Sequence, residues 1–332
     1  MSDAMDQEVE KQRSEQEVLK LSTLLVAQHR PEGVLRRVQV IINPAAGKDQ
    51  PILKVLNAAF RPAGIDWDVV ITKEAGDGRR LAEEAVKAGA DAVVVHGGDG
   101  TVMEVASGLV GSDTPLAIIP GGTANVLSRE LNIPVDLVEA CSLIINPDAL
   151  VRKIDVGKLD DHFFVLRAGM GFEADMVEGA DRDLKDRMWL LAYTFSAMQA
   201  LAEPTIARYR ITLDGKLVET EGLTCMIANS GNVGTPGITL HPAINISDGL
   251  LDVIVVTKAD LPSLVALVAS VVGKSESPNT LQHWQARQVT VESDPPQNVQ
   301  LDGEMVGSTP VSASLIPHAI RVIVPAVVDA TP

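Results

Sequence analysis

Between residue 37 and about residue 134, short apolar runs alternate with segments of helical spacing. The apolar runs are rich in Val and Ile and predict buried strands at 38–42, 66–71, 92–95 and 115–119. Apolar residues spaced three or four positions apart predict helices at 52–60, 79–88, 102–109 and 125–131. This alternation predicts a parallel sheet with crossover helices, in which ligands bind beyond the carboxyl ends of the strands.

From about residue 150 the pattern changes to short β-type runs separated by turn residues, at 153–156, 163–166, 209–213, 223–228, 251–256, 288–291, 299–301 and 320–324. Two segments of helical character, 187–201 and 261–272, interrupt these runs. Many short strands with turn signals between them predict an antiparallel sandwich or barrel. The two patterns together predict an α/β protein with a Rossmann-like parallel-sheet domain followed by an antiparallel sandwich or barrel.

We expect an extension at 1–36, a parallel-sheet domain at 37–150 and an antiparallel β domain at 151–332, whose last strand could return to the first domain. The extension is charged and then mildly amphipathic. It is either a helix that packs, dimerises or touches a membrane, or a solvated extension without chemistry.

Composition narrows the range of partners. The 332 residues suffice for two domains, and the net charge of −16 opposes binding to nucleic acid. Cys141, in a predicted helix, and Cys225, in a predicted strand, have no metal-type spacing and are expected to be buried free thiols in a reducing compartment. No secretory signal is visible, and the longest apolar stretch, Leu261 to Val272, is too short to span a bilayer. A cytoplasmic protein is expected, which would act on a lipid only from the membrane surface.

Residues 97–101, Gly-Gly-Asp-Gly-Thr, follow the third predicted strand and precede a predicted helix. Glycines there allow close approach to phosphates, and the N–H groups that begin a helix favour anions. Asp99 can hold Mg²⁺ directly or through water. An ordinary tight turn is the competing interpretation, and the combination of small residues with an acid between strand and helix favours phosphoryl transfer.

The other predicted strands of this sheet end in similar residues. Asn43-Pro-Ala-Ala-Gly47-Lys48 follows the first strand, Thr72 and Lys73 the second, and Pro120-Gly-Gly-Thr-Ala-Asn125 the fourth. Any one of these loops could reflect turn chemistry alone. Since parallel strands end at one edge, four such loops predict a single nucleotide cleft.

These segments resemble the bacterial diacylglycerol kinase family, within the lipid kinase superfamily that also holds sphingosine and ceramide kinases. The resemblance runs from about Arg37 to the C-terminus. It rests on Asn43–Gly47, Gly97–Thr101 with Glu104, Gly121–Asn125, Gly169–Ala174, Ser247–Asp252 and Leu301–Glu304. It implies a phosphofructokinase-like nucleotide domain and a β-sandwich domain with the active site between them. The sequence departs from the family at Gly76-Asp77-Gly78, where Gly-His-Ala is usual.

The resemblance implies ATP and Mg²⁺ as cofactors and gives each motif a role. The residues that it places at the nucleotide are Asn43, Pro44, Gly47, Thr72, Gly97, Gly98, Asp99, Gly100, Thr101, Val102, Met103, Glu104, Thr123 and Asn125. Asp99 would also serve the catalytic Mg²⁺. Lys48 is either a counter-charge for phosphate or a solvated loop residue.

The resemblance also implies a proton acceptor in the segment Leu301-Asp-Gly-Glu304. Glu304 is the first choice, because it matches the position usually assigned, and Asp302 is the second. Without the resemblance, Asp302-Gly303 would be interpreted as a hairpin turn. Asp248, with carbonyl groups near Asn245 and Leu250, would bind a structural Mg²⁺, although Ser-Asp-Gly is also turn-forming by itself.

Three functions remain open at this stage. The first is an ATP-dependent lipid kinase for diacylglycerol or another lipid, such as a sphingosine-like lipid or monoacylglycerol. The second is a kinase for a soluble alcohol such as NAD, and the third is a sensor without catalysis. A basic rim at Arg182, Lys185 and Arg187 would favour a lipid, unless those charges only face solvent. The family resemblance makes a homodimer the expected assembly.

Overall fold

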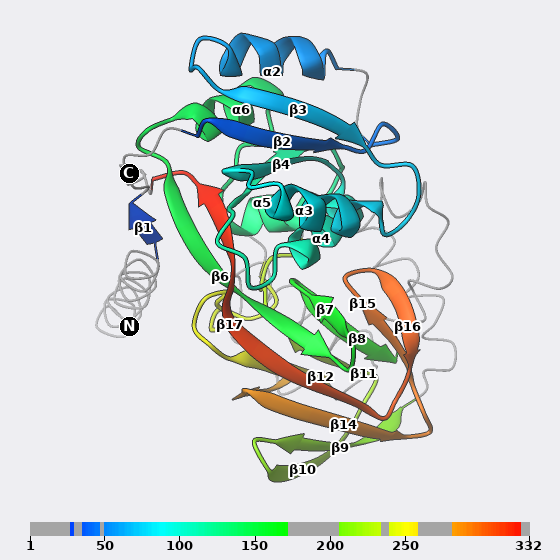
Figure 1. Cartoon of the computed structure of the whole chain (residues 1–332). Helices are drawn as coiled ribbons and strands as arrows, with labels where there is room; N and C mark the ends of the chain where they lie inside the picture. Colours follow the sequence, from blue (N-terminus) through cyan, green and yellow to red (C-terminus); the bar gives the residue numbers. More distant parts are fainter. Residues whose placement is uncertain are drawn as a thin grey trace, which may run out of the picture.

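The computed structural model describes residues 27–29, 35–46, 50–171, 206–233, 239–257 and 281–326. The segments predicted as helices at 187–201 and 261–272, the rim residues Arg182, Lys185 and Arg187, and most of the N-terminal extension lie outside them. Figure 1 shows an α/β half and a second half whose described elements are all strands, and the long strands β6 and β17 run from one to the other.

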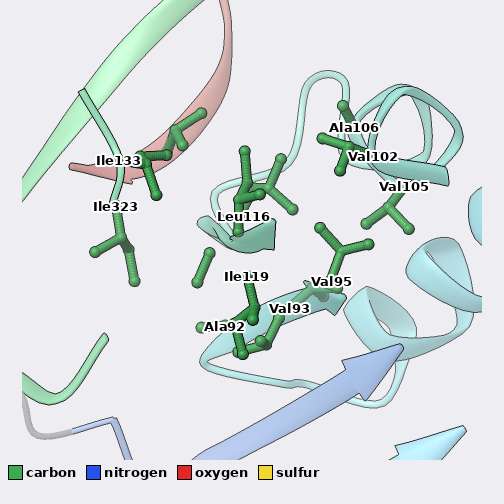
Figure 2. Close-up of a cluster of buried hydrophobic side chains, with 14 of the residues drawn as sticks. Ala92, Val93, Val95, Val102, Val105, Ala106, Leu116, Ile119, Ile133 and Ile323 are labelled. Atoms are coloured by element: carbon green, nitrogen blue, oxygen red, sulfur yellow. The ribbon is translucent and has the colours of Figure 1, made fainter. Parts of the chain in front are cut away.

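Four parallel strands form the sheet of the α/β half, in the order β5-β4-β2-β3. They are β2 (Arg37–Ile42), β3 (Asp66–Ile71), β4 (Ala92–Gly97) and β5 (Leu116–Pro120). Every residue of β4 and β5 is buried, as expected for strands covered on both faces. Figure 2 shows this core, where Val93, Val95 and Ile119 meet Val102 and Val105 of the following helix. The predicted parallel sheet is confirmed.

The described helices of this half are α2 (Ile52–Phe60), α3 (Asp77–Lys87), α4 (Asp99–Gly108), α5 (Val126–Glu130) and α6 (Leu137–Ile145). Helix α6 contains Cys141, which was expected to lie in a helix; its N-cap is Asp136, whose carboxylate accepts hydrogen bonds from the amides of Val138 and Glu139. Helix α4 begins three residues before the predicted start at Val102. The Asp99–Thr101 part of the glycine-rich motif is therefore the first helical turn.

Strand β17 (Val311–Val324) connects the two halves. It pairs with β14 (Gln288–Asp294) near its start, and near its end Val322 lies beside Leu116 of β5 in parallel. It also runs antiparallel to β6 (Leu150–Leu159), with a register shift between Ile316 and Ile320. One sheet of eleven strands thus spans both halves. The remaining strands of this sheet are β1 (Ala27–His29), β7 (His162–Phe164), β9 (Ala207–Leu213) and β10 (Lys216–Gly222).

A second, antiparallel sheet completes the β-sandwich. Its order is β13-β12-β11-β8-β15-β16. These strands are β8 (Arg167–Gly171), β11 (Thr224–Ala228), β12 (Leu251–Val256), β13 (Leu281–Ala286), β15 (Asn298–Leu301) and β16 (Glu304–Ser308). Phe164 and Tyr209 of the large sheet pack with Cys225, Val253 and Val299 of the small one in a shared core. The predicted fold class is confirmed.

Two local expectations were wrong. The run 163–166 is not one strand, because β7 ends at Phe164 and β8 begins at Arg167. Residues 27–29, expected in a helical or flexible extension, form β1 and pair with Leu150–Arg152 of β6. The domain limits at 37–150 and 151–332 stay a prediction. Among the described helices, none is long and apolar enough to cross a membrane.

Leu116 has no exposed surface and lies at the junction of β4, β5 and β17. Leu116→Ala should lower the free energy of unfolding by about 2–5 kcal/mol, because it removes buried contacts and leaves a cavity. Leu217→Ala is the matched control, since Leu217 is 50% exposed on β10. Urea unfolding followed by circular dichroism would measure both. Equal stability of the two variants would contradict this account of the junction.

Candidate active site

The loops at the carboxyl ends of the parallel strands meet at one edge of the sheet. The side-chain amide of Asn43, after β2, donates a hydrogen bond of 2.8 Å to the hydroxyl of Thr101 in α4. The Asn43 side-chain oxygen accepts from the amide of Ala45, two residues further on, which shapes the turn that contains Pro44. Thr72 continues β3, and its amide bonds to the carbonyl of Ile42. Gly47 and Lys48 lie outside the described residues.

The two glycine pairs of the predicted cleft pack backbone against backbone. The amide of Gly121 donates to the carbonyl of Gly97 over 2.8 Å. A Cβ atom on Gly122 would lie 2.8 Å from the Cα of Gly98, which is too close for any side chain. The loops after β4 and β5 are therefore in direct backbone contact.

Asp99 joins these loops to helix α5. Its carboxylate accepts a hydrogen bond of 2.7 Å from the amide of Val126, the first residue of α5. Burial raises the pKa of Asp99, although backbone hydrogen bonds from the start of α5 act in the opposite direction. Asn125 has a φ of 48°, and its side chain closes the preceding turn through two bonds to Gly122. Thr123, between them, is exposed.

The remaining predicted nucleotide residues divide into two groups. Gly100 is exposed in the first turn of α4, where its backbone is open to a ligand. Val102 and Met103 are buried, and Val102 packs in the core of the α/β half. Their side chains therefore stabilise α4, and only their backbone could serve a nucleotide.

Glu104 holds the loop that precedes α3. Its carboxylate accepts hydrogen bonds of 2.9 Å from the amides of Gly76 and Gly78. A Cβ atom on Gly78 would lie 2.8 Å from both the Cβ and Oε2 of Glu104. Asp77 holds the same loop through the amides of Lys73 and Glu74. The segment Gly76-Asp77-Gly78, where the sequence departs from the family pattern, is thus fixed by α4.

Asp302 occupies the turn between β15 and β16, so the hairpin turn expected at Asp302-Gly303 is confirmed. Asp302 and Gly303 have positive φ angles of 47° and 95°, as a two-residue hairpin requires. The Asp302 carboxylate also accepts three backbone hydrogen bonds of 2.8–3.0 Å, from Val165, Leu166 and Arg167. Loss of water raises its pKa to about 6, although these bonds and the charge of Arg167 act in the opposite direction.

Glu304 is the first residue of β16 and is exposed, opposite Leu301 of β15. The lone pairs of the Asp302 carboxylate are committed to three amides, whereas Glu304 presents its carboxylate to solvent at the end of the same hairpin. The geometry therefore favours Glu304 as the group that meets a substrate.

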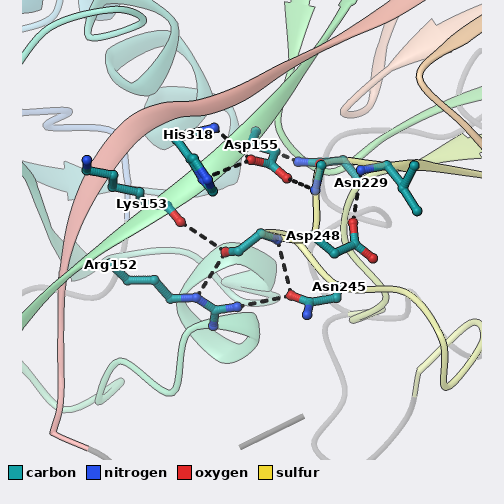
Figure 3. Close-up of polar contacts among 10 residues, drawn as sticks. Arg152, Lys153, Asp155, Asn229, Asn245, Asp248 and His318 are labelled. Carbon is teal, nitrogen blue, oxygen red and sulfur yellow. Dashed lines mark hydrogen bonds and ion pairs between the residues drawn. The ribbon is translucent and has the colours of Figure 1, made fainter. Parts of the chain in front are cut away.

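The turn proposed for magnesium lies beside β6 and β17 (Figure 3). The Asp248 carboxylate accepts from the amide of Leu250, and the Asn245 side-chain oxygen accepts from Arg152 and from the amide of Ser247. Desolvation, with a further contribution from neighbouring carboxylates, raises the pKa of Asp248 to about 6. A nearby cation would relieve this cost of ionisation.

Within the described part of the chain, no three His, Cys, Asp or Glu side chains converge to hold a metal. One carboxylate with backbone carbonyl groups and waters still fits Mg²⁺, which usually retains several waters. The residues at the turn are therefore compatible with the predicted ion.

Asp155 was missed by the sequence analysis and holds this turn in place. It is fully buried on β6, and its two oxygens accept hydrogen bonds of 2.7 Å from the amides of Gly249 and His318. His318 lies in the register shift of β17, with a φ of 52°. No sequence motif identifies Asp155 as a functional residue. The only signal was that a single acidic residue is rare within an apolar strand.

Glu130, at the end of α5, was also missed. Its carboxylate accepts from the hydroxyl of Ser230 over 2.7 Å and from the amide of Asn232 over 2.9 Å. These bonds connect helix α5, whose first amide donates to Asp99, to the loop that follows β11. The loops of the candidate site are thus connected to the β-sandwich through α5.

Glu104→Gln should destabilise the protein by about 1–3 kcal/mol, because one of the two amides of the 76–78 loop would then face an NH₂ group instead of an acceptor. Differential scanning calorimetry would measure the loss. Glu83→Gln, at an exposed position of α3, is the control and should change little. A Glu104→Gln protein as stable as the wild type would show that the two hydrogen bonds contribute nothing to the fold.

Asp302 should make stability depend on pH. Its pKa is raised in the folded protein, so its contribution is fully present below the ordinary value of 3.8 and is lost as the pH rises through about 6. The difference in unfolding free energy between the wild type and Asp302→Asn should therefore shift against the wild type between pH 4 and pH 6–7. Urea titrations across this range would measure it. A constant difference would contradict the raised pKa.

Comparison with known proteins agrees with the family and the two-part fold that the sequence predicts. Residues 37–159 match the diacylglycerol kinase catalytic domain, and residues 167–324 match the YegS C-terminal NAD kinase beta sandwich-like domain. The chain is 29% identical to a diacylglycerol kinase of Bacillus subtilis, over 88% of this chain and 97% of that protein. It is 33% identical to a Pseudomonas aeruginosa protein named "Probable lipid kinase YegS-like", over 86% of this chain and 93% of that protein.

A crystal structure of a diacylglycerol kinase from Bacillus anthracis matches with a TM-score of 0.70 and 28% identity, covering 90% of this chain and all of that one. The chain spans 58% of the length of a further relative, an uncharacterized Synechocystis protein that is 33% identical to it. Both halves of the structure, including the loops of the candidate site, fall within the matched regions. The chain belongs to the lipid kinase family that combines the diacylglycerol kinase catalytic domain with the YegS-type C-terminal domain.

Proposed function

We propose that this protein transfers the γ-phosphate of ATP to the hydroxyl group of diacylglycerol, giving phosphatidic acid and ADP. The observation that carries the proposal is the hairpin of Asp302 and Glu304, which is bonded to residues 165–167 beside the loops of the parallel sheet. The relatives named as diacylglycerol kinases and the YegS-like lipid kinase support the choice of a lipid acceptor.

The nucleotide would lie along the carboxyl edge of the parallel sheet. The backbone of Gly97, Gly98 and Gly100 and the first turn of α4 offer N–H groups to phosphate oxygens. Asn43, Pro44, Thr72, Thr123 and Asn125 surround this surface, with Gly47 as a further predicted contact. The backbone of Val102 and Met103 continues it, and Glu104 supports it through the 76–78 loop.

In the transfer step, the acceptor oxygen would attack the γ-phosphorus, the bond to the β-γ bridging oxygen would break, and ADP would leave. Glu304 would receive the proton of the acceptor hydroxyl. Asp302 would position the hairpin that carries Glu304, because its carboxylate is held by three amides. At pH 7, above its pKa of about 6, Asp302 is the ionised acceptor that these amides require.

Mg²⁺ would supply charge neutralisation at the phosphates when bound. Asp99 would serve it at the catalytic position, and Asp248 with the carbonyls of Asn245 and Leu250 would hold a second, structural ion. We infer a cytoplasmic enzyme that binds the membrane surface peripherally to reach its substrate, and a homodimer as its assembly.

The test is transfer of labelled γ-phosphate from ATP with Mg²⁺ to diacylglycerol in mixed micelles, with sphingosine, ceramide, monoacylglycerol and NAD as parallel acceptors. NAD is included because the C-terminal domain model is named for its likeness to NAD kinase. Label in phosphatidic acid would support the proposal. Label only in another lipid would change the substrate and keep the reaction, whereas label only in NAD would overturn the lipid acceptor.

Glu304→Gln should lower kcat by about 10²- to 10⁴-fold with little change in the KM for ATP, since it removes the proton acceptor and leaves the nucleotide loops intact. Glu292→Gln, at an exposed position on β14, is the control and should retain activity. The same assay with varied ATP separates kcat from KM. A fully active Glu304→Gln enzyme would remove Glu304 from the mechanism.

A further inference from the structure

Strand β6 holds the turn proposed for magnesium through neighbouring residues of the strand. The amide of Asp155 donates to the carbonyl of Ile246 over 2.8 Å. The carbonyl of Lys153 accepts from the hydroxyl of Ser247 over 3.0 Å. Arg152 is the next residue towards the start of the strand, and its guanidinium reaches the turn directly (Figure 3). The position of the turn therefore depends on β6.

The guanidinium of Arg152 fixes the side chain of Asn245. Its Nη2 donates to the side-chain oxygen of Asn245 over 3.3 Å, and its Nε donates to the hydroxyl of Ser247 over 3.1 Å. The amide of Ser247 donates to the same Asn245 oxygen over 3.1 Å. Donors from two separate segments thus orient Asn245, whose main-chain carbonyl is one of the expected ligands of the ion.

Arg152 is a buried cation, with 8% of its surface exposed. Arginine is rarely buried to this extent without a charged partner, and the two side chains to which Arg152 donates, Asn245 and Ser247, are uncharged. Burial lowers the pKa of the guanidinium, although the charges of Glu130 and Asp155 act in the opposite direction. An apolar side chain of similar length would fill the space at a lower desolvation cost. The hydrogen bonds to the turn therefore explain why an arginine stands here.

We propose that Arg152 is a positioning residue for the structural Mg²⁺: it orients Asn245 and, through it, the turn that carries Asp248. This inference rests on the proposed function, which assigns the ion to this turn. Mg²⁺ demands a nearly ideal arrangement of its oxygen ligands, so a small rotation of the turn weakens its binding. Arg152 acts through Asn245 and is not itself a ligand, because a guanidinium has no acceptor atom to offer a cation.

The planar fork of the guanidinium suits this task. Its N–H groups lie in one plane and bond two acceptors at once, here Asn245 and Ser247. A lysine ammonium is a point charge on a flexible stem and would hold the two acceptors less firmly. The positive charge by itself opposes the binding of a nearby cation, so the contribution of Arg152 comes from geometry. Charge and geometry therefore predict opposite effects on Mg²⁺ affinity when the guanidinium is removed.

The experiment compares the wild type with Arg152→Met, Arg152→Lys, Asn245→Ala and the double variant Arg152→Met/Asn245→Ala. Asn245→Ala removes the side-chain acceptor and keeps the main-chain carbonyl. Leu56→Ala, at a fully buried position on α2, is the control for a loss of stability alone. The full-length proteins are titrated with MgCl₂ by calorimetry, without nucleotide and at a temperature where each is folded. The rise in melting temperature with Mg²⁺ gives a second measure of affinity.

Arg152→Met should weaken Mg²⁺ binding by about tenfold or more, as is typical when a residue that orients a metal ligand is removed. Asn245→Ala should weaken it by a similar factor. The double variant should bind no more weakly than either single variant, because both substitutions remove the same contact. Arg152→Lys should recover part of the affinity, and Leu56→Ala should melt at a lower temperature and bind Mg²⁺ as the wild type does. Activity that Arg152→Met loses at low Mg²⁺ should return as Mg²⁺ is raised.

The inference is overturned if folded Arg152→Met binds Mg²⁺ as tightly as the wild type, or more tightly, since the guanidinium would then act through its charge or not at all. Additive effects of the two substitutions would also overturn it, as would a wild type that binds no Mg²⁺ in the absence of nucleotide. Should Arg152→Met not fold, unchanged affinity in Asn245→Ala decides against the inference.

The inference and the proposed function can fail separately. A wild type that labels no lipid, but whose Mg²⁺ binding weakens on Arg152→Met substitution, would refute the lipid acceptor and keep Arg152 as a positioning residue. Label in phosphatidic acid, with equal Mg²⁺ affinity in wild type and Arg152→Met, would keep the proposed function and refute the role of Arg152.

Discussion

The pairing of β17 with strands from both halves is the constraint on which the rest of the structure depends. This strand lies beside β14 at one end and β5 at the other, and β6 accompanies it between them. Because the pairing register of a strand fixes which face each side chain occupies, the orientation of the β-sandwich against the parallel sheet is set by this ladder. The hairpin of Asp302 and Glu304 and the glycine-rich loops are held on a common framework.

Carboxylates that accept hydrogen bonds from backbone amides organise the site. Asp155 binds Gly249 and His318, Asp302 binds three consecutive amides, Glu104 binds Gly76 and Gly78, and Asp99 binds Val126. Each of these bonds joins segments far apart in the sequence. Charge-assisted hydrogen bonds of this kind are stronger than neutral ones, which suits loops that lack regular pairing.

The sequence predicted those parts of the fold that local chemistry determines. Val and Ile runs identified β2 to β5, and Gly-Gly-Asp-Gly-Thr indicated the loop after β4, because both signals are carried by neighbouring residues. The contacts of Glu104 could not be predicted, since the Gly76 amide that it binds lies 28 positions away. The roles of Asp155 and Glu130 could not be predicted for the same reason. A helix was expected at Cys141, but the start of α6 was not predicted, because it depends on the cap at Asp136.

The backbone amides of residues 165–167 all donate to Asp302, and their carbonyls accept hydrogen bonds from Asn229, Ser230 and Asp302. This complete pairing affects how much conformational entropy is lost in each catalytic cycle. A segment whose backbone groups all have partners loses its conformational freedom when the chain folds, not when substrate arrives. The conformational entropy of this part of the site is therefore lost when the protein folds, and not again at each turnover. At each turnover, most of the entropy loss falls on the substrates, whose flexible parts become immobilised against residues 165–167, a segment that is already ordered.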